Sequence, residues 1–156
     1  MSDKLQQTMN IVGDQTNIQL SGIVDEDADF SKLKGIGTKE VVFDFQKITM
    51  INSCGIREWI QSLSNLKPGI RISYINCPQI IIEQINMVQG FIPKGASVES
   101  FYAPYFCESC DKEVKILLKR SEVPQFKAPE MKCPDCGDTM DFDAIESQYF
   151  NFLKQG

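Results

Sequence analysis

Four cysteines in the last third of the 156-residue chain restrict its fold more than any other feature. Cys107 and Cys110 form one Cys-x2-Cys pair, and Cys133 and Cys136 form a second pair after 22 intervening residues. Two such pairs present four thiolates to one ion in the tetrahedral arrangement that Zn²⁺ prefers. Residues 104–156 are therefore predicted to form a zinc ribbon that ends in a C-terminal helix.

Two disulfides are the alternative explanation of the same spacing. Residues 1–10 lack the apolar core of a signal peptide, and the chain has no run of 18 apolar residues, so we expect a cytoplasmic protein without a membrane span. Thiols stay reduced in the cytosol, which favours a metal over disulfides. Four cysteines leave no position for water on the ion, so one structural Zn²⁺ is expected rather than a catalytic one.

Residues 41–66 predict a buried strand, a tight turn and an amphipathic helix. The strand is indicated by the apolar run VVFDF, and the helix by apolar residues at helical spacing, namely Ile56, Trp59, Ile60 and Leu63. In the turn, Asn52 or Ser53 can cap the helix, and Gly55 permits a close backbone approach. A phosphate or thiolate at Ser53 or Cys54 would be stabilised by the positive end of the helix.

The run VVFDF-x6-NSCGI resembles the signature of STAS domains, which occur in anti-sigma factor antagonists and in the cytoplasmic part of sulphate transporters. The usual family pattern is an apolar strand, then Asp-Ser-Ser-Gly or Asp-Ser-Thr-Gly, then a helix. In the bacterial antagonists a partner kinase phosphorylates the hydroxyl residue before the glycine, and the phosphate changes partner choice. Here Asn52 replaces the usual Asp, Ser53 keeps the first hydroxyl, and Cys54 occupies the switch position without being able to form phosphoserine.

The order of elements extends the resemblance over residues 5–103. We expect a hairpin of strands at 5–12 and 16–24, a short helix closed by 34–37, the central strand and helix, a strand at 70–75, a helix at 78–89 and a last strand at 91–103. The fold class is therefore α/β. A STAS-like mixed sheet covered by helices on one side is expected in residues 1–103, followed by the small zinc ribbon in residues 104–156.

The resemblance implies a non-enzymatic regulatory protein that binds another protein through Asn52, Ser53, Cys54 and Gly55. The implied partner is a serine kinase of the histidine-kinase-like ATPase fold, a phosphatase or a larger sensory complex. The chain contains no histidine, which excludes His-based nucleophilic triads and His metal ligands. It also lacks a phosphate loop of the Walker type, so an enzyme is not expected.

Two other functions stay open. Zinc ribbons often bind nucleic acid or the transcription machinery, but the seven basic residues from Pro104 onward are outnumbered by ten acidic ones, and the whole chain has a formal charge of −5. This balance argues against binding through phosphates. Cys54 is either a packing residue or a thiol activated by the helix N-terminus to sense oxidants. Ser53 likewise either caps the helix or is phosphorylated.

Two further segments allow more than one interpretation. The cluster of Asp25, Glu26, Asp27 and Asp29 lacks the glycine and terminal Glu of an EF-hand, which favours a solvated, acid-rich helix start over a calcium loop. The aromatic segment 143–153 is expected to pack on the ribbon, on the sheet or on a partner, and most simply closes a small core.

Overall fold

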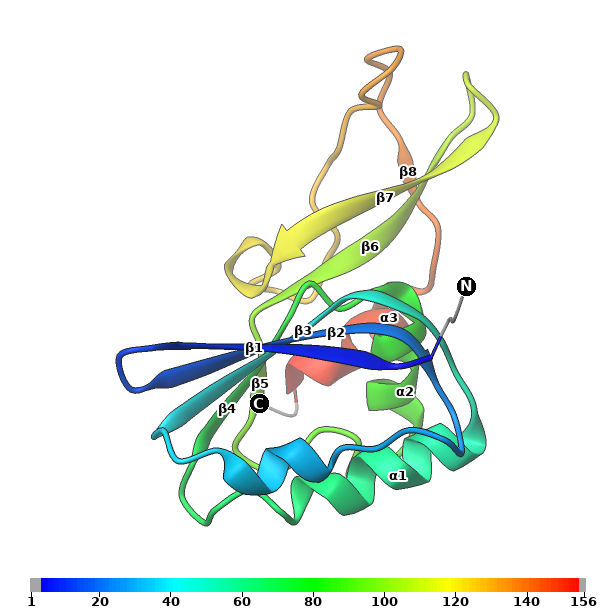
Figure 1. The fold of residues 1–156 in the computed structure, drawn as a ribbon. Helices are drawn as coiled ribbons and strands as arrows, with labels where there is room; N and C mark the ends of the chain where they lie inside the picture. The colour runs from blue at the N-terminus through cyan, green and yellow to red at the C-terminus, as the bar shows by residue number, and fades with distance from the viewer. Residues whose placement is uncertain (1–3, 155–156) are drawn as a thin grey trace.

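The computed structural model describes residues 4–154, which form two β-sheets (Figure 1). The strands of the larger sheet, in spatial order, are β1 (Gln6–Val12), β2 (Gln15–Val24), β3 (Glu40–Ile51), β4 (Arg71–Ile75) and β5 (Ser97–Val98). β1 and β2 pair antiparallel, whereas the other neighbours pair parallel. The predicted hairpin and the mixed α/β sheet are therefore confirmed.

The helices cover one face of this sheet. They are η1 (Ser31–Gly35), α1 (Ser53–Leu63) and α2 (Gln79–Met87), with η1 and α1 lying side by side in Figure 1. Along β3, Val41, Phe43 and Phe45 are buried toward the helices, while the residues between them are partly exposed. This alternation is expected for a sheet with one covered face. None of the helices within residues 4–154 is both long and apolar enough to cross a membrane.

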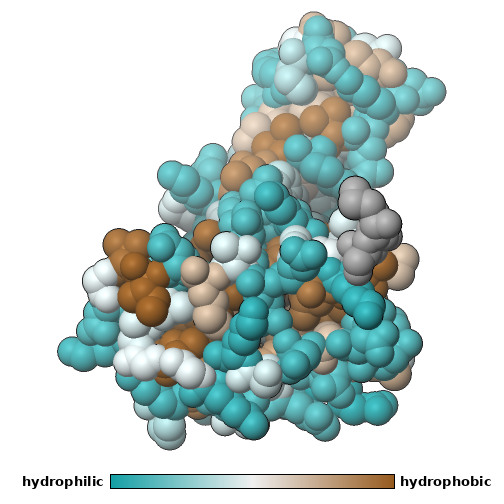
Figure 2. Space-filling view, in the orientation of Figure 1, coloured by the Kyte–Doolittle hydropathy of each residue, from teal (hydrophilic) through white to brown (hydrophobic). Residues whose placement is uncertain are grey.

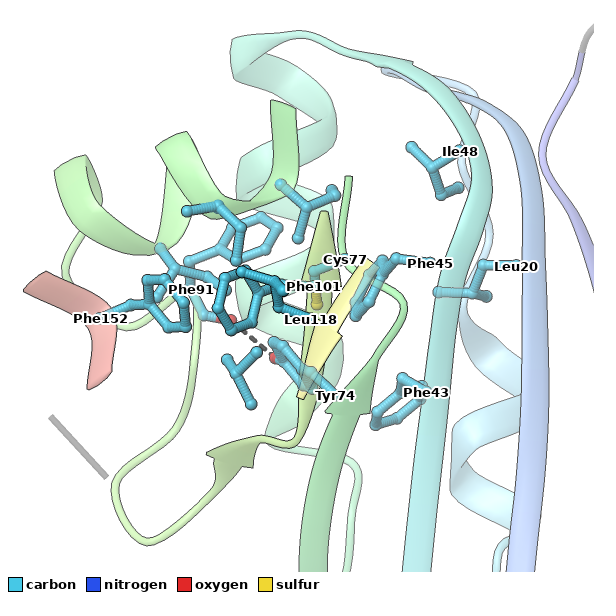
Figure 3. Packing of buried hydrophobic residues seen from close by; sticks show 14 of the residues in the cluster. Leu20, Phe43, Phe45, Ile48, Tyr74, Cys77, Phe91, Phe101, Leu118 and Phe152 are labelled. Carbon is cyan, nitrogen blue, oxygen red and sulfur yellow. Dashed lines mark hydrogen bonds between the residues drawn. The ribbon is translucent and has the colours of Figure 1, made fainter. Parts of the chain in front are cut away.

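The core between sheet and helices is built around Trp59 of α1. Its ring lies 4.9 Å from the ring of Phe43 and 6.0 Å from that of Tyr74, both in edge-to-face contact. The indole Nε1 donates to the Phe91 carbonyl oxygen at 3.1 Å. The Tyr74 hydroxyl donates to the same oxygen at 2.7 Å, which is the dashed line in Figure 3. The polar atoms of two large buried side chains are thereby satisfied, which fixes how α1 sits on the sheet.

The smaller sheet has the order β7-β6-β8 and is antiparallel throughout. Its strands are β6 (Ser100–Cys107), β7 (Lys112–Lys119) and β8 (Asp141–Phe142), and the short η2 (Arg120–Glu122) follows β7. β6 runs without a break across residues 103 and 104. Its first residues also form hydrogen bonds with Cys77, which follows β4 of the larger sheet. The Cys77 amide donates to the Ser100 carbonyl oxygen, and the Tyr102 amide donates to the Cys77 carbonyl oxygen.

The prediction of a single strand over residues 91–103 was wrong. Gly90 and Gly95 adopt positive φ angles of 92° and 88°, and Pro93 lies between them, so the chain turns repeatedly before it reaches β5. β5 contains only two residues and ends at Val98. The apolar residues after Glu99 belong to β6 and to the other sheet.

The C-terminal segment forms two short helical turns, α3 (Glu146–Tyr149) and η3 (Phe150–Lys154), that pack on α2 and β6. The Asn86 side chain of α2 donates to the Tyr149 carbonyl oxygen at 3.0 Å. The Tyr149 hydroxyl donates to the Tyr102 carbonyl oxygen, and the ring of Phe152 packs edge-on against Phe101 at 4.9 Å. The aromatic tail therefore closes the core between the helices and the smaller sheet, which is the simplest of the arrangements expected for it.

Candidate functional site

Asn52 holds the turn between β3 and α1 through three contacts. Its side-chain Oδ1 accepts a hydrogen bond from the Gly55 amide at 2.8 Å, and its own amide donates to the Val24 carbonyl oxygen at 3.1 Å. Its Nδ2 donates to the Glu26 carboxylate at 3.1 Å. Asn52 is therefore the helix N-cap. The interpretation of Ser53 as the cap was wrong, because Ser53 is the first residue of α1 and is exposed.

Gly55 is required by the close contact of α1 with the end of β2. A Cβ atom at this position would lie 2.1 Å from the Val24 carbonyl oxygen and 2.4 Å from its carbon. Both are backbone atoms, which cannot move aside as a flexible side chain would. The close backbone approach expected from the sequence is thus present, and it sets the first turn of α1 directly against the β2 terminus.

Glu26 gives a physical reason for an asparagine at position 52. Its own backbone amide and the Asn52 side chain lower the pKa of the Glu26 carboxyl, because both donate to the charged form. An aspartate at position 52 would lose this donor and place a second carboxylate beside the first. Sequence reasoning missed this pair, since the two residues are 26 positions apart and come from different loops.

The surface around the turn combines apolar and acidic groups. Met50 is 54% exposed and Ser53 is exposed, whereas Cys54 is half-buried on the first turn of α1. The acidic residues after β2 form a turn rather than the helix start that the sequence indicated. Asp25 accepts from the Asp27 amide, and the Asp29 carboxylate accepts from the Ser31 amide at the beginning of η1. Among the described residues, these acids do not converge as metal ligands.

The structure brings Cys107, Cys110, Cys133 and Cys136 together beside the end of β6 and the start of β7. Their Sγ atoms all lie within 4.8 Å of one another, with 3.5 Å between Cys107 and Cys136 and 3.9 Å between Cys110 and Cys133. Four sulphurs at about 2.3 Å from a central ion in a tetrahedron are about 3.8 Å apart. The observed separations fit such a site, so these residues can hold a metal ion.

The backbone around each cysteine pair has the form of a knuckle. The residue after the second cysteine of each pair has a positive φ angle, 51° at Asp111 and 79° at Gly137. The Cys110 amide donates to the Cys107 sulphur at 3.4 Å, as expected for a loop that presents two sulphurs to one ion. An ion pair between Lys112 and Asp135 also joins the two knuckles.

Electrostatics among the thiols point in the same direction. The hydrogen bonds that Cys110 makes with Cys136 and Cys107 raise the pKa of its thiol to about 12, whereas a backbone amide donated by Cys136 lowers the pKa of the Cys133 thiol. Ionising Cys110 among these sulphurs therefore costs more than ionising an ordinary thiol, because hydrogen bonds to its neighbours favour the neutral form. A divalent cation among them removes that penalty.

The two other cysteines lie apart from this cluster in different surroundings. Cys77 follows β4 and is completely buried, and burial raises the pKa of its thiol well above the ordinary value. It therefore acts as a small core residue. All six cysteines have free thiols in this structure, so the four clustered cysteines do not form the two disulfides that their spacing also allows.

Comparisons with known proteins identify no family. No protein-family model matches the chain, and no curated protein matches it either. The crystal structure of an anti-sigma factor antagonist from Mycobacterium paratuberculosis is similar, with a TM-score of 0.43 and 13% sequence identity over 51% of this chain and 74% of that chain. A similarity this weak carries no functional argument, so function has to be inferred from the turn and the cysteine cluster.

Proposed function

We propose that the protein is a non-enzymatic regulatory module of the STAS type that binds a protein partner through Asn52, Ser53, Cys54 and Gly55. One observation carries this proposal: Ser53 is exposed on the first turn of a helix that is capped by Asn52 and pressed against β2 at Gly55. A rigid, exposed turn of this kind presents the same surface to every partner. Negative charge added at the turn is stabilised by the positive end of the helix.

The composition of the turn describes the partner that would fit it. Met50 supplies an exposed apolar side chain, and Glu26 supplies a carboxylate beside the helix N-terminus. A complementary surface needs an apolar depression next to a basic group. By the STAS resemblance of the signature, the partner is a kinase of the histidine-kinase-like ATPase fold, a phosphatase or a sensory complex.

Added charge at Ser53 would act on the partner more than on the fold. The α1 dipole stabilises a nearby anion by about 0.3–1 kcal/mol. Glu26 bonds to the neighbouring Asn52, so its carboxylate opposes this gain. The two effects act in opposite directions within the folded chain, whereas a partner that contacts the turn experiences the full change in charge.

The test is affinity capture from cells that make the protein, with the retained proteins identified by mass spectrometry. Ser53→Glu and Cys54→Glu place a carboxylate on the first turn of α1. Gln61→Glu serves as the matched control, because Gln61 is exposed near the other end of the same helix. We expect the two turn variants to release a partner that wild type and Gln61→Glu retain. Identical partners in all four samples would refute the proposal.

We also propose that Cys107, Cys110, Cys133 and Cys136 bind one structural Zn²⁺. The sulphur separations support this assignment, and four thiolates saturate the ion. Elemental analysis of the purified chain should give one zinc per molecule, and Cys133→Ala should abolish it. Substitution with Co²⁺ should produce the spectrum of a tetrahedral thiolate site. A metal-free protein with an intact fold would contradict the assignment.

The alternatives receive less support from the same residues. Three lysines of the predicted ribbon segment contact local acceptors. Lys112 pairs with Asp135, Lys115 pairs with Glu113, and Lys132 donates to Thr139. These contacts leave less free positive charge for nucleic acid. Redox sensing at Cys54 would require a thiol that reacts faster than free cysteine with a mild alkylating agent, which a rate measurement tests directly.

A further inference from the structure

The β1 strand is a free edge of the larger sheet. It occupies one end of the strand order and pairs only with β2, so one side of its backbone has no strand partner in the part of the chain that the structure describes. In Figure 1 it is the strand nearest the viewer. An unpaired edge presents N–H and C=O groups that can pair with another strand.

The β1 sequence carries none of the features that usually protect such an edge. Its seven residues, QQTMNIV, include no charged residue, no proline and no glycine. The edge strand β7 of the smaller sheet is different, because four of its eight residues, KEVKILLK, are charged. Charges at an edge discourage pairing, so the two sheets differ in a way that favours association through β1.

Apolar side chains are exposed on both faces of β1. Met9 and Ile11 pair with Ile18 and Thr16 of β2, which places them on the face that the helices cover farther along the sheet. Ile11 is nevertheless 67% exposed, and Val12 on the opposite face is 59% exposed. Figure 2 shows apolar surface beside the β1–β2 hairpin. These side chains would lose contact with water if another strand lay alongside.

We propose that a second copy of this chain pairs antiparallel with β1 about a two-fold axis at Asn10. Antiparallel partners point to the same face of a sheet, so this register sets Met9 opposite Ile11 of the second copy. It also sets Thr8 opposite Val12 of the second copy, and Asn10 opposite its own counterpart. The apolar side chains of one strand therefore meet those of the other, and the two five-stranded sheets become continuous.

A register shifted by one pair is less suitable. Centring the axis on Met9 would place Gln7 opposite Ile11 of the second copy. Gln7 is already engaged, because its side chain donates to the Asp29 carbonyl oxygen within its own chain. The absence of charge in β1 also suits self-association of a chain whose formal charge is −5, since no carboxylates are brought together at the axis.

The size of the contact predicts a weak dimer. Five paired residues extend over about 17 Å of strand, and the interface is smaller than the ~800 Å² per partner of a standard stable complex. A dissociation constant on the order of tens to hundreds of micromolar is expected for a small contact of this kind. The dimer should therefore appear only at high protein concentration.

Sedimentation equilibrium of the full, zinc-loaded chain between about 10 μM and 1 mM tests the proposal in the range expected for a weak contact. The mass should rise from 17.7 kDa toward twice that value. Asn10→Lys places two like charges opposite each other and should keep the protein monomeric. Gln61→Lys adds the same charge at an exposed position on α1 and should dimerise like wild type.

A charge-swap experiment separates loss of pairing from loss of folding. Asn10→Lys and Asn10→Asp should each be monomeric, and their equimolar mixture should recover a heterodimer at least as stable as the wild-type dimer. Wild type that stays monomeric at the highest concentration would refute the proposal, as would Asn10→Lys that dimerises normally or a mixture that stays monomeric. A monomeric wild type whose β1 captures a foreign protein that Asn10→Lys releases would likewise show that the occupant is not a second copy.

Discussion

Replacing Gly55 with alanine should destabilise the fold strongly for a change of one methyl group. The added Cβ would lie 2.1 Å from the Val24 carbonyl oxygen, 2.4 Å from its carbon and 2.9 Å from the Asp25 amide nitrogen. All three atoms belong to the backbone at the end of β2, so α1 and β2 have to separate by about 1 Å to restore an ordinary van der Waals contact.

The magnitude follows from the contacts that this separation disrupts. Overpacking of a close contact costs about 1–3 kcal/mol. Movement of the turn also weakens the hydrogen bond from the Asn52 amide to the Val24 carbonyl oxygen, which contributes about 0.5–1.5 kcal/mol. The better helix propensity of alanine returns at most about 1 kcal/mol. The net loss of unfolding free energy therefore lies between about 0.5 and 4.5 kcal/mol, and its centre of about 2.5 kcal/mol corresponds to roughly 5–10 °C in Tm for a domain of this size.

Thermal unfolding monitored by Trp59 fluorescence measures this effect. Gly37→Ala is the matched control, because a Cβ at Gly37 would meet no atom within 4 Å and its backbone is not in the left-handed region. We expect Gly37→Ala to stay within about 1 kcal/mol of wild type. If Gly55→Ala has the same Tm as Gly37→Ala, the close contact of α1 with β2 does not constrain the turn.

Three further predictions concern the cap, the metal site and alkaline pH. Asn52→Asp should keep the cap but raise the pKa of the Glu26 carboxyl above its value in the wild-type protein, as measured by NMR titration, because a donor is replaced by a like charge; Asn52→Ser, which also suits a cap but adds no charge, should raise it less, and an equal rise would contradict the effect of the like charge. A strong chelator should remove the metal from the four cysteines and lower the Tm reported by Trp59, although Trp59 is far from them in sequence. Burial raises the pKa values of Tyr74 and Tyr149, so their contribution to stability is complete below the unfolded-state pKa of about 10 and is lost as pH rises above it, by about 1.4 kcal/mol per pH unit for each tyrosine. Tyr74→Phe should reduce the total slope by about 1.4 kcal/mol per pH unit in urea unfolding experiments above about pH 10, and an unchanged slope would contradict the assignment to burial.

The sequence was most informative where a short pattern determines a local geometry. The apolar run before Asn52 and the helical spacing of Trp59 predicted β3 and α1, because both elements bury a single face against the same core. The Cys-x2-Cys spacing indicated which thiols would meet, because each knuckle is defined by four consecutive residues and does not depend on how the chain between the knuckles folds. Such signals are complete within a few residues.

The features that the sequence did not reveal depend on residues that are distant along the chain. The hydrogen bond between Asn52 and Glu26 joins two loops, and only the parallel pairing of β2 with β3 brings their ends together. The run of apolar residues after Glu99 looked like the last strand of the larger sheet. Its hydrogen-bond partners lie in β7 and β8, and a periodic apolar pattern does not indicate which strand will pair with it.

β6 explains why loss of the proposed Zn²⁺ should affect the stability of the whole protein. Its first half is part of the main core, since Phe101 and Ala103 are fully buried, and it ends at Cys107 in the cysteine cluster. Without an ion, the chain loses the bonds that tie the loop before β8 to the hairpin of β6 and β7. Phe101 also packs on Phe152, so a frayed β6 exposes the aromatic tail as well. Chelation that unfolded only the smaller sheet, with the Trp59 transition unchanged, would mean that the first half of β6 is stable without its second half.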